Sequence, residues 1–288
     1  MSLLSEAFGF GLIAAAVLAI AAVGFTLQFA VTDVLNLAFA SVMTAGAFIA
    51  YLLNSVGVSV WIALLASMVA CSLLSVLLNY FVYAPFQRRG SAPITLVIVS
   101  LGMGLIIEFG VQAFVGGISV SYNMSLGRTL HFAGLVLTTV QLIIMAISVA
   151  VMLFVHSLLR YTKLGKAMRA TAANRMLARS CGIRASRVIA GTWAITGALC
   201  GLAGTVYAIN VGSFDATSND IFLILILAAV FLGGPGNAYG AMVGALVIGL
   251  ATEVSANYVQ ADYKYVIAFL ALLAMLAVRP TGLLGSKT

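Results

Sequence analysis

The side chains best suited to chemistry in this sequence are a few acids, hydroxyls and amides set inside long apolar runs. The stretch Thr32-Asp33-Val34-Leu35-Asn36 separates two such runs. Polar and ionisable groups are costly in an apolar interior, and they are often kept there for function. The candidate residues for a polar pathway are Thr32, Asp33, Asn36, Ser41, Thr44 and Glu108.

Each of these residues also has a purely structural interpretation. Asp33 could cap a helix that starts near Leu35 by accepting bonds from its free N–H groups. Thr32, Asn36, Ser41 and Thr44 either line a pathway or satisfy backbone groups freed at the break. Glu108 is either neutral, paired with Arg128, or close to an outer surface.

The sequence gives no sign of an active site, a metal centre or a bound cofactor. His131 and His156 stand apart from any cysteine or carboxylate at ligand spacing. The stretch from Gly282 to Thr288 resembles a phosphate-binding loop but lacks its spacing and its following helix. We therefore expect no enzyme and no cofactor; if ATP drives this protein, another chain must bind it.

The composition points to a membrane protein made of helices. Of 288 residues, 63% are hydrophobic and 7% are charged, against about 25% charged in soluble domains. We predict an all-α polytopic bundle of eight or nine hydrophobic segments, some short or broken, forming one domain over 1–288. The predicted helices are 8–31, 35–53, 58–82, 93–115, 135–159, 188–210, 221–233, 240–256 and 264–278.

The positive charges are concentrated in one loop. Eight of the 14 cationic residues lie between Arg160 and Arg187, with no acid among them. Under the positive-inside bias this loop is cytoplasmic, as are Arg88, Arg89, Arg279 and Lys287. Counting back along the chain, we expect the N-terminus outside and the C-terminus inside.

A short capped helix is predicted inside this loop. Asn174 is a suitable N-cap, and Gly182 can adopt the left-handed conformation that ends a helix. Either the segment is a solvated basic loop that only sets topology, or its apolar residues dock a partner. The residues concerned are Asn174, Arg175, Met176, Leu177, Ala178, Arg179 and Gly182.

Glycines recur at four-residue spacing in two places. They include Gly197 and Gly201, followed by Gly204, and the series Gly236, Gly240 and Gly244. Glycines on one helix face let a second helix approach closely. Close packing and chance are both open for a chain so rich in glycine.

Four motifs in order resemble the permeases of branched-chain amino acid ABC importers, most closely the shorter of the two permeases that such importers use. They are Thr162 to Ala170 with Asn174, Ala178, Gly182 and Ile183; Gly197 to Gly204; Leu232 to Gly244; and Arg279 to Gly285. The likeness extends over nearly the whole chain. It implies a multi-pass protein of the bacterial inner membrane.

The resemblance also implies partners and a role for the short helix. Residues 174–182 would be a coupling helix that docks on an ATP-binding subunit, of which two are expected. A second, paralogous permease, an external solute-binding protein and membrane lipid complete the expected partners, with no nucleic acid. Family members carry a His and a Glu after the first helix where this chain has Phe39 and Ser41, which leaves the solute open.

The residues alone also leave a second function open. A secondary transporter of a small amphipathic solute would need an ion-binding or titratable group within the membrane. Asp33 and Glu108 are the candidates for that role.

Overall fold

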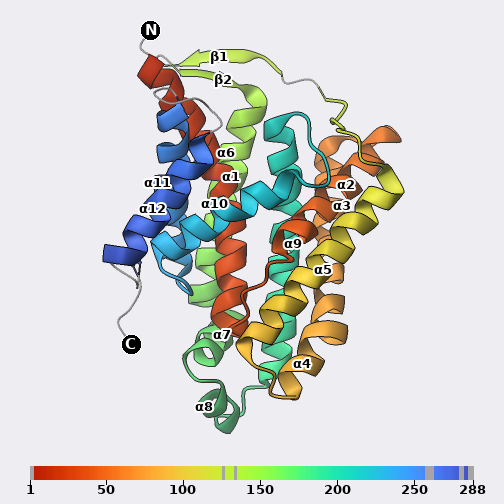
Figure 1. Ribbon diagram of the computed structural model, residues 1–288, viewed down its shortest axis with the longest axis vertical. Helices are drawn as coiled ribbons and strands as arrows, with labels where there is room; N and C mark the ends of the chain where they lie inside the picture. Colours follow the sequence, from red (N-terminus) through yellow and green to blue (C-terminus); the bar gives the residue numbers. More distant parts are fainter. Residues whose placement is uncertain (1–2, 125–126, 133–134, 257–262, 279–281, 285–288) are drawn as a thin grey trace. The chain divides into compact units, whose positions relative to one another are not determined.

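The computed structural model describes residues 3–124, 127–132, 135–256, 263–278 and 282–284. Its described part is dominated by helices, with one short hairpin (Figure 1). The elements are α1 (Leu3–Thr32), α2 (Phe39–Ser55), α3 (Val60–Leu78), the π-helix η1 (Asn79–Tyr83), α4 (Ala84–Arg88), α5 (Pro93–Val115), β1 (Thr129–Phe132), β2 (Leu135–Thr138), α6 (Thr139–Tyr161), α7 (Lys163–Ala173), α8 (Arg175–Ser180), α9 (Ala185–Val211), α10 (Ser218–Gly233), α11 (Ala238–Ala256) and α12 (Lys264–Val278).

The predicted helical bundle is confirmed, although several segments differ from their predicted bounds. Six described helices are long and apolar enough to cross a membrane, and three shorter apolar helices accompany them. The segment 135–138, predicted as helix, is instead β2, which pairs antiparallel with β1 so that Thr138 lies opposite Thr129. Its Leu-Val-Leu-Thr sequence contains β-branched residues that favour a strand over a helix start.

The first break differs from its prediction. The second helix starts at Phe39, four residues later than expected, so Asp33 does not cap it. Asp33 instead takes a positive φ of 55° directly after α1, and its N–H still donates to Phe29 O at 2.9 Å. A left-handed residue at this point ends a helix, so Asp33 terminates α1 rather than opening α2.

The chain divides into two compact units. One unit comprises Met1–Thr26, Met124–Met152 and Ile221–Thr288. Within it, Leu283 N and Leu284 N donate to Leu232 O and Gly233 O at 2.8 and 3.0 Å. Part of the C-terminal motif therefore pairs with the last residues of α10, while Arg279 and Lys287 lie outside the described residues.

The glycines of this unit have two structural roles, one in a turn and one in a contact between helices. Gly236 has a φ of 86° and precedes α11, so it does not share a helix face with Gly240 and Gly244. Gly240 and Gly244 approach the backbone of Gly233 and Ala229 on α10, leaving no room for a Cβ. Asn237 caps α11 by accepting from Tyr239 N at 3.0 Å.

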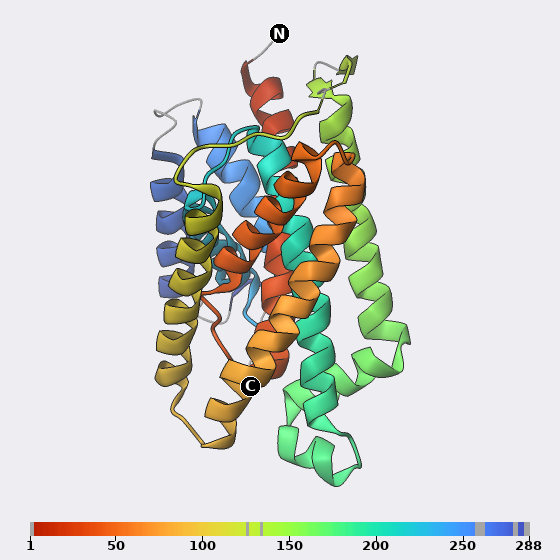
Figure 2. The ribbon, with the colours of Figure 1, turned by 90° about the vertical axis from the view of Figure 1, so that its right-hand side faces the viewer.

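The second unit, Leu27–Asn123 and Leu153–Asp220, is built around α2, α3 and α9. Figure 2 shows these three helices side by side. A Cβ on Gly197 or Gly201 would lie 2.5 Å from a backbone oxygen of α3, and Gly204 lies against Met43 of α2. Ser67 Oγ lies 3.2 Å from Gly201 O and 3.0 Å from Thr205 Oγ1. Small residues and hydroxyls thus join the helices where large side chains would separate them.

Candidate functional site

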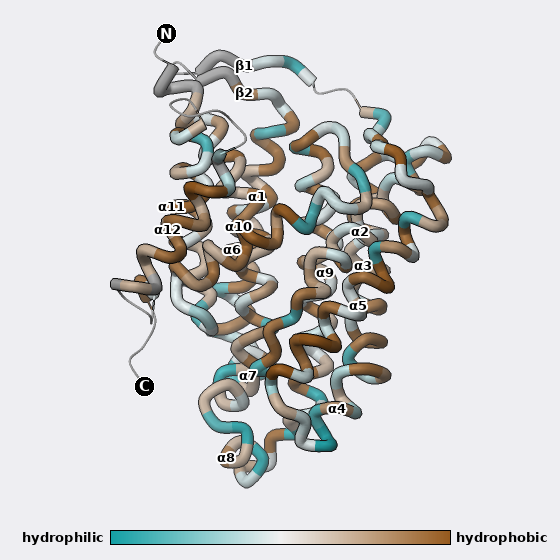
Figure 3. Tube along the Cα trace, viewed as in Figure 1, coloured by the Kyte–Doolittle hydropathy of each residue, from teal (hydrophilic) through white to brown (hydrophobic). Residues whose placement is uncertain are grey.

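The short helix α8 lies in a hydrophilic part of the chain. Figure 3 shows hydrophilic residues gathered along α7, α8 and the end of α4. Asn174 Oδ1 accepts from Leu177 N at 2.9 Å, which satisfies an otherwise free N–H of the first turn. At the other end Gly182, with a φ of 81°, donates to Arg179 O, and Ile183 N donates to Ala178 O. This pair of bonds is a Schellman motif, so both ends of α8 are held by local hydrogen bonds.

The apolar residues of α8 point in different directions. Met176 is 81% exposed and Leu177 is 63% exposed, whereas Ala178 is only 4% exposed. Met176 and Leu177 are therefore the exposed apolar side chains of α8, whereas Ala178 is part of the buried interior.

Arg175 connects α8 to the end of α1. Its Nη2 donates to Val31 O at 3.1 Å and to Thr32 O at 3.4 Å. These carbonyls lie in the last turn of α1, where backbone acceptors lack helical partners and the helix dipole favours a cation. Gln87 of α4 also donates to Thr32 O, at 3.4 Å. The first residue of α8 is thus tied to the point where α1 breaks.

The segment after this break is held by buried polar side chains. Tyr83 donates its hydroxyl hydrogen to Asn36 Oδ1 at 2.8 Å, and Asn36 Nδ2 donates to Gln28 Oε1 at 3.4 Å. Ser100 of α5 accepts from Leu37 N at 3.0 Å and donates to Leu35 O at 3.3 Å. An irregular segment in an apolar environment needs such partners for its free backbone groups.

A second polar cluster joins α2 to the start of α10. Asn219 Nδ2 donates to Thr44 Oγ1 at 3.0 Å, and Thr44 Oγ1 donates to Ala216 O at 3.4 Å. Thr44 and Asn219 are both buried. Thr44, a candidate residue from the sequence, is therefore in direct contact with Ala216 and Asn219 within one unit. Ser41 is also buried and lies beside Gly104 of α5.

Glu108 lies against another acid. It is 7% exposed, and its carboxyl group interacts with that of Asp220 at the start of α10. Next to them, Asp215 Oδ1 accepts from Ser218 Oγ at 2.7 Å and from Thr217 N at 3.0 Å. These bonds, with Ser218 the larger contributor, hold the pKa of the Asp215 carboxyl below its usual value.

Gln28, Tyr83 and Ser100 are not among the residues predicted from the sequence, whereas Asn219 stands in a polar stretch before the predicted helix 221–233. Gln28, Tyr83, Ser100 and Asn219 all contact the candidate segments, and Gln28 Nε2 and Asn219 Oδ1 are buried with no hydrogen-bond partner among the described residues. Buried polar atoms without a partner are rare in proteins. The sequence does mark Gln28 and Asn219 as unusual, because each is an amide within or beside an apolar run.

These features define a helical membrane protein with several spans and with polar side chains buried between its helices. The chain belongs to the family described as "Branched-chain amino acid transport system / permease component", whose profile matches residues 7–276.

Proteins with similar sequences match this chain over almost its full length. The permease protein LivH of the high-affinity branched-chain amino acid transport system of Escherichia coli (strain K12) is 27% identical over 280 residues, covering 93% of this chain and 91% of LivH. The corresponding protein BraD of Pseudomonas aeruginosa is 27% identical over 289 residues, covering 96% and 94%. The chain is therefore similar to these permeases over more than nine-tenths of its length.

A solved structure shares the fold. PsaBC from Streptococcus pneumoniae in complex with Fab matches with a TM-score of 0.55 at 14% identity, covering 94% of this chain and 91% of that chain. At this identity the likeness bears on the arrangement of helices alone.

Proposed function

We propose that this chain is a membrane permease subunit of an ATP-driven importer, with ATP hydrolysed by two separate subunits. The observation that carries the proposal is α8: a helix capped at both ends that exposes Met176 and Leu177 while Arg175 holds the end of α1. The basic loop and the C-terminus are cytoplasmic and the N-terminus is outside. The two compact units act as one permease domain.

The mechanism follows from the contacts of α8. An ATP-binding subunit that covers Met176 and Leu177 presses differently on α8 in its ATP-bound and ATP-free states. Differential binding of this kind is what shifts a conformational equilibrium. Arg175 transmits the displacement to Val31 and Thr32, and from there to the polar break at Asp33–Asn36.

The proposed solute is a branched-chain or similar small amino acid. Support comes from the family and from the buried amides of the interior, since Gln28 Nε2 can donate to a carboxylate and Asn219 Oδ1 can accept from an ammonium group. A solute-binding protein outside the membrane delivers the solute, and a second, paralogous permease completes the pathway.

Co-purification with ATP-binding subunits tests this proposal. Met176→Glu combined with Leu177→Glu places two charges on the exposed face of α8, and we expect the ATP-binding subunits to be lost from the detergent-purified complex. Arg169→Glu on α7 changes the net charge of the same loop by the same amount and should retain them. Retention by the double variant, with the chain inserted normally, would remove the docking role of α8.

A second candidate is supported by an electrostatic interaction between two acids. The interaction of Glu108 with Asp220 places two carboxyl groups together, as an ion-coupled secondary transporter would need. Uptake by intact cells distinguishes an ATP-driven importer from a secondary transporter. When the proton gradient is collapsed while ATP is held constant, uptake by a secondary transporter stops and uptake by an ATP-driven importer continues.

A further inference from the structure

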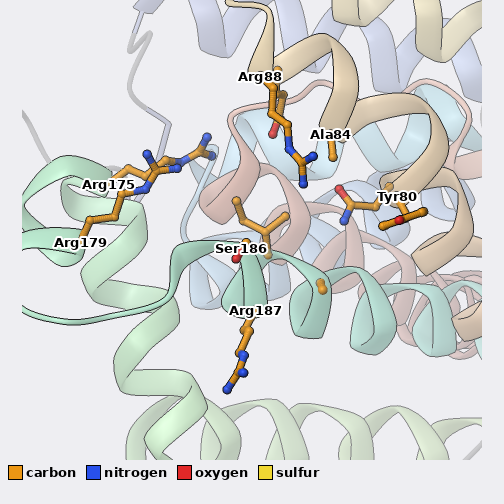
Figure 4. Close-up of a pocket in the computed structure, with 11 residues that line it drawn as sticks. Tyr80, Ala84, Arg88, Arg175, Arg179, Ser186 and Arg187 are labelled. Carbon is orange, nitrogen blue, oxygen red and sulfur yellow. The ribbon is translucent and has the colours of Figure 1, made fainter.

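A cavity of about 570 Å³ is bounded by η1 and α4 on one side and by α8 and the start of α9 on the other. Four of its lining residues are arginines: Arg88, Arg175, Arg179 and Arg187. Figure 4 shows Arg88 extending into the space from one side and Arg175 and Arg179 from the other, while Arg187 extends away from it. Three arginine side chains therefore line the cavity from two sides, and one of them, Arg175, also donates to the end of α1.

The lining of the cavity supplies no acid to balance these charges, and the described part of the chain offers Arg88 and Arg179 no ion-pair partner. Like charges around one space repel one another unless an anion lies between them. Guanidinium groups bind phosphate with particular geometric fit, because each presents several N–H donors in a planar fork.

A buried polar atom adds a second requirement. Asn79 lines the cavity and is only 7% exposed, yet its Oδ1 has no hydrogen-bond partner among the described residues. That oxygen needs a donor. A ligand that carries both an anionic phosphate and hydroxyl groups would satisfy the arginines and Asn79 together, which a bare phosphate ion would do less well.

The position of the cavity favours a lipid as the source of that group. Two candidate membrane spans, Val60–Arg88 and Ala185–Val211, have one end at the cavity. Tyr80 and Phe81, both largely exposed, lie on η1 beside it. Aromatic residues at the end of a span are typical of the membrane–water interface, where lipid headgroups lie. Basic pockets between spans at this depth bind anionic headgroups.

We propose that this cavity binds the headgroup of an anionic phospholipid with a polyol headgroup, such as phosphatidylglycerol. The phosphate lies between Arg88 and the two arginines of α8, and a headgroup hydroxyl donates to Asn79 Oδ1. The site does not depend on the importer function. Because Arg175 also holds the end of α1, the bound lipid stabilises the arrangement in which α8 and α1 are connected.

Native mass spectrometry of the purified protein measures the binding directly. Protein from nanodiscs containing phosphatidylcholine and phosphatidylglycerol should retain phosphatidylglycerol selectively. Arg88→Gln should lower that retention about fivefold, the effect of one arginine near an anionic headgroup. Asn79→Leu should weaken it, and Arg88→Lys should restore part of it. The matched control is Arg89→Gln, which removes the neighbouring charge outside the cavity and should retain lipid like the wild type.

Each other outcome overturns the proposal. Equal retention of the two lipids, or equal retention by the Arg88→Gln and wild-type proteins, would show that the cavity does not select an anionic headgroup. Displacement of the lipid by millimolar inorganic phosphate would make it a site for free anions. If Arg88→Gln releases ATP-binding subunits without changing lipid retention, the arginines bind an acidic protein surface. The lipid measurement needs no uptake, so its failure is separable from failure of the importer function.

Discussion

Arg175 joins α8 to the end of α1 through two hydrogen bonds. A charged donor that meets the terminal carbonyls of a helix satisfies acceptors that have no other partner and also interacts with the helix dipole. Asn174 and Gly182 position Arg175 by ending α8 at defined points. The carbonyls of Val31 and Thr32 place its other end at the break of α1.

Replacing Arg175 should uncouple transport from ATP hydrolysis. Hydrogen bonds to charged groups contribute about 1.5–3 kcal/mol, so Arg175→Ala should lower solute uptake roughly tenfold or more while the ATP-binding subunits still co-purify and hydrolyse ATP. Arg169→Ala on α7 removes an equal charge and should leave uptake unchanged. Uptake at the wild-type rate in Arg175→Ala would show that the contact with α1 transmits nothing.

Glu108 gives a prediction that separates the two functional candidates. Its carboxyl lies beside Asp220 in a buried position, and glutamine preserves its size and hydrogen-bonding capacity. We expect Glu108→Gln to retain most solute uptake in reconstituted vesicles. Complete loss of uptake, with normal assembly, would instead place a titrating carboxylate at the centre of transport and favour ion coupling.

Asp215 gives a pH-dependent prediction. Its pKa is lowered in the folded chain by hydrogen bonds from Ser218 and Thr217. A lowered pKa stabilises the fold above the unfolded value of about 3.9, and that stabilisation is lost as the pH falls through the folded value. Asp215→Asn should therefore melt a few degrees below wild type at pH 7, and the difference should shrink toward pH 3. A difference that stays constant with pH would contradict this role.

At the scale of elements, the packing of α3 against α9 depends on absent side chains. A Cβ at Gly201 would lie 2.5 Å from Ser67 O, so the two helices would have to separate. Gly102 on α5 has open space where its Cβ would be. The two glycines therefore form a matched pair within one unit.

Gly201→Ala should destabilise the protein and Gly102→Ala should not. Overpacking a close helix contact typically costs about 1–3 kcal/mol, whereas alanine in an open helical position is neutral or slightly stabilising. Thermal unfolding in detergent measures both. Equal melting temperatures for the two variants would mean that α3 and α9 do not pack as closely as described.

The elements also show what a single sequence can reveal. The ends of α8 were predictable because Asn174 and Gly182 act through local hydrogen bonds. Helix α7 was not predicted, because Lys163–Ala173 is basic and polar, a composition typical of a loop.

Tertiary contacts could not be predicted in the same way. The contact of Asn219 with Thr44 joins residues 175 positions apart, and no local pattern encodes such a pairing. The prediction that Asp33 caps the second helix was wrong, because α2 starts later than expected. The length of the break depends on tertiary partners such as Ser100.

At the scale of the whole molecule, the apolar composition and the spacing of charges were enough to predict a multi-span bundle, because a span needs about 20 apolar residues. Family membership then joins this fold to transport. The two compact units share α1, α6 and α10, each of which has residues in both units.

The central claim is that ATP hydrolysis by partner subunits drives solute through this chain by way of α8. The most direct test is uptake of radiolabelled leucine into proteoliposomes that contain the complete purified complex and the solute-binding protein, with ATP present or absent and with an ionophore as control. We predict uptake that requires ATP, survives collapse of the proton gradient and is lost in the Met176→Glu, Leu177→Glu variant. Uptake that continues without ATP and stops when the gradient is collapsed would show that an ion gradient, and not ATP hydrolysis, drives transport.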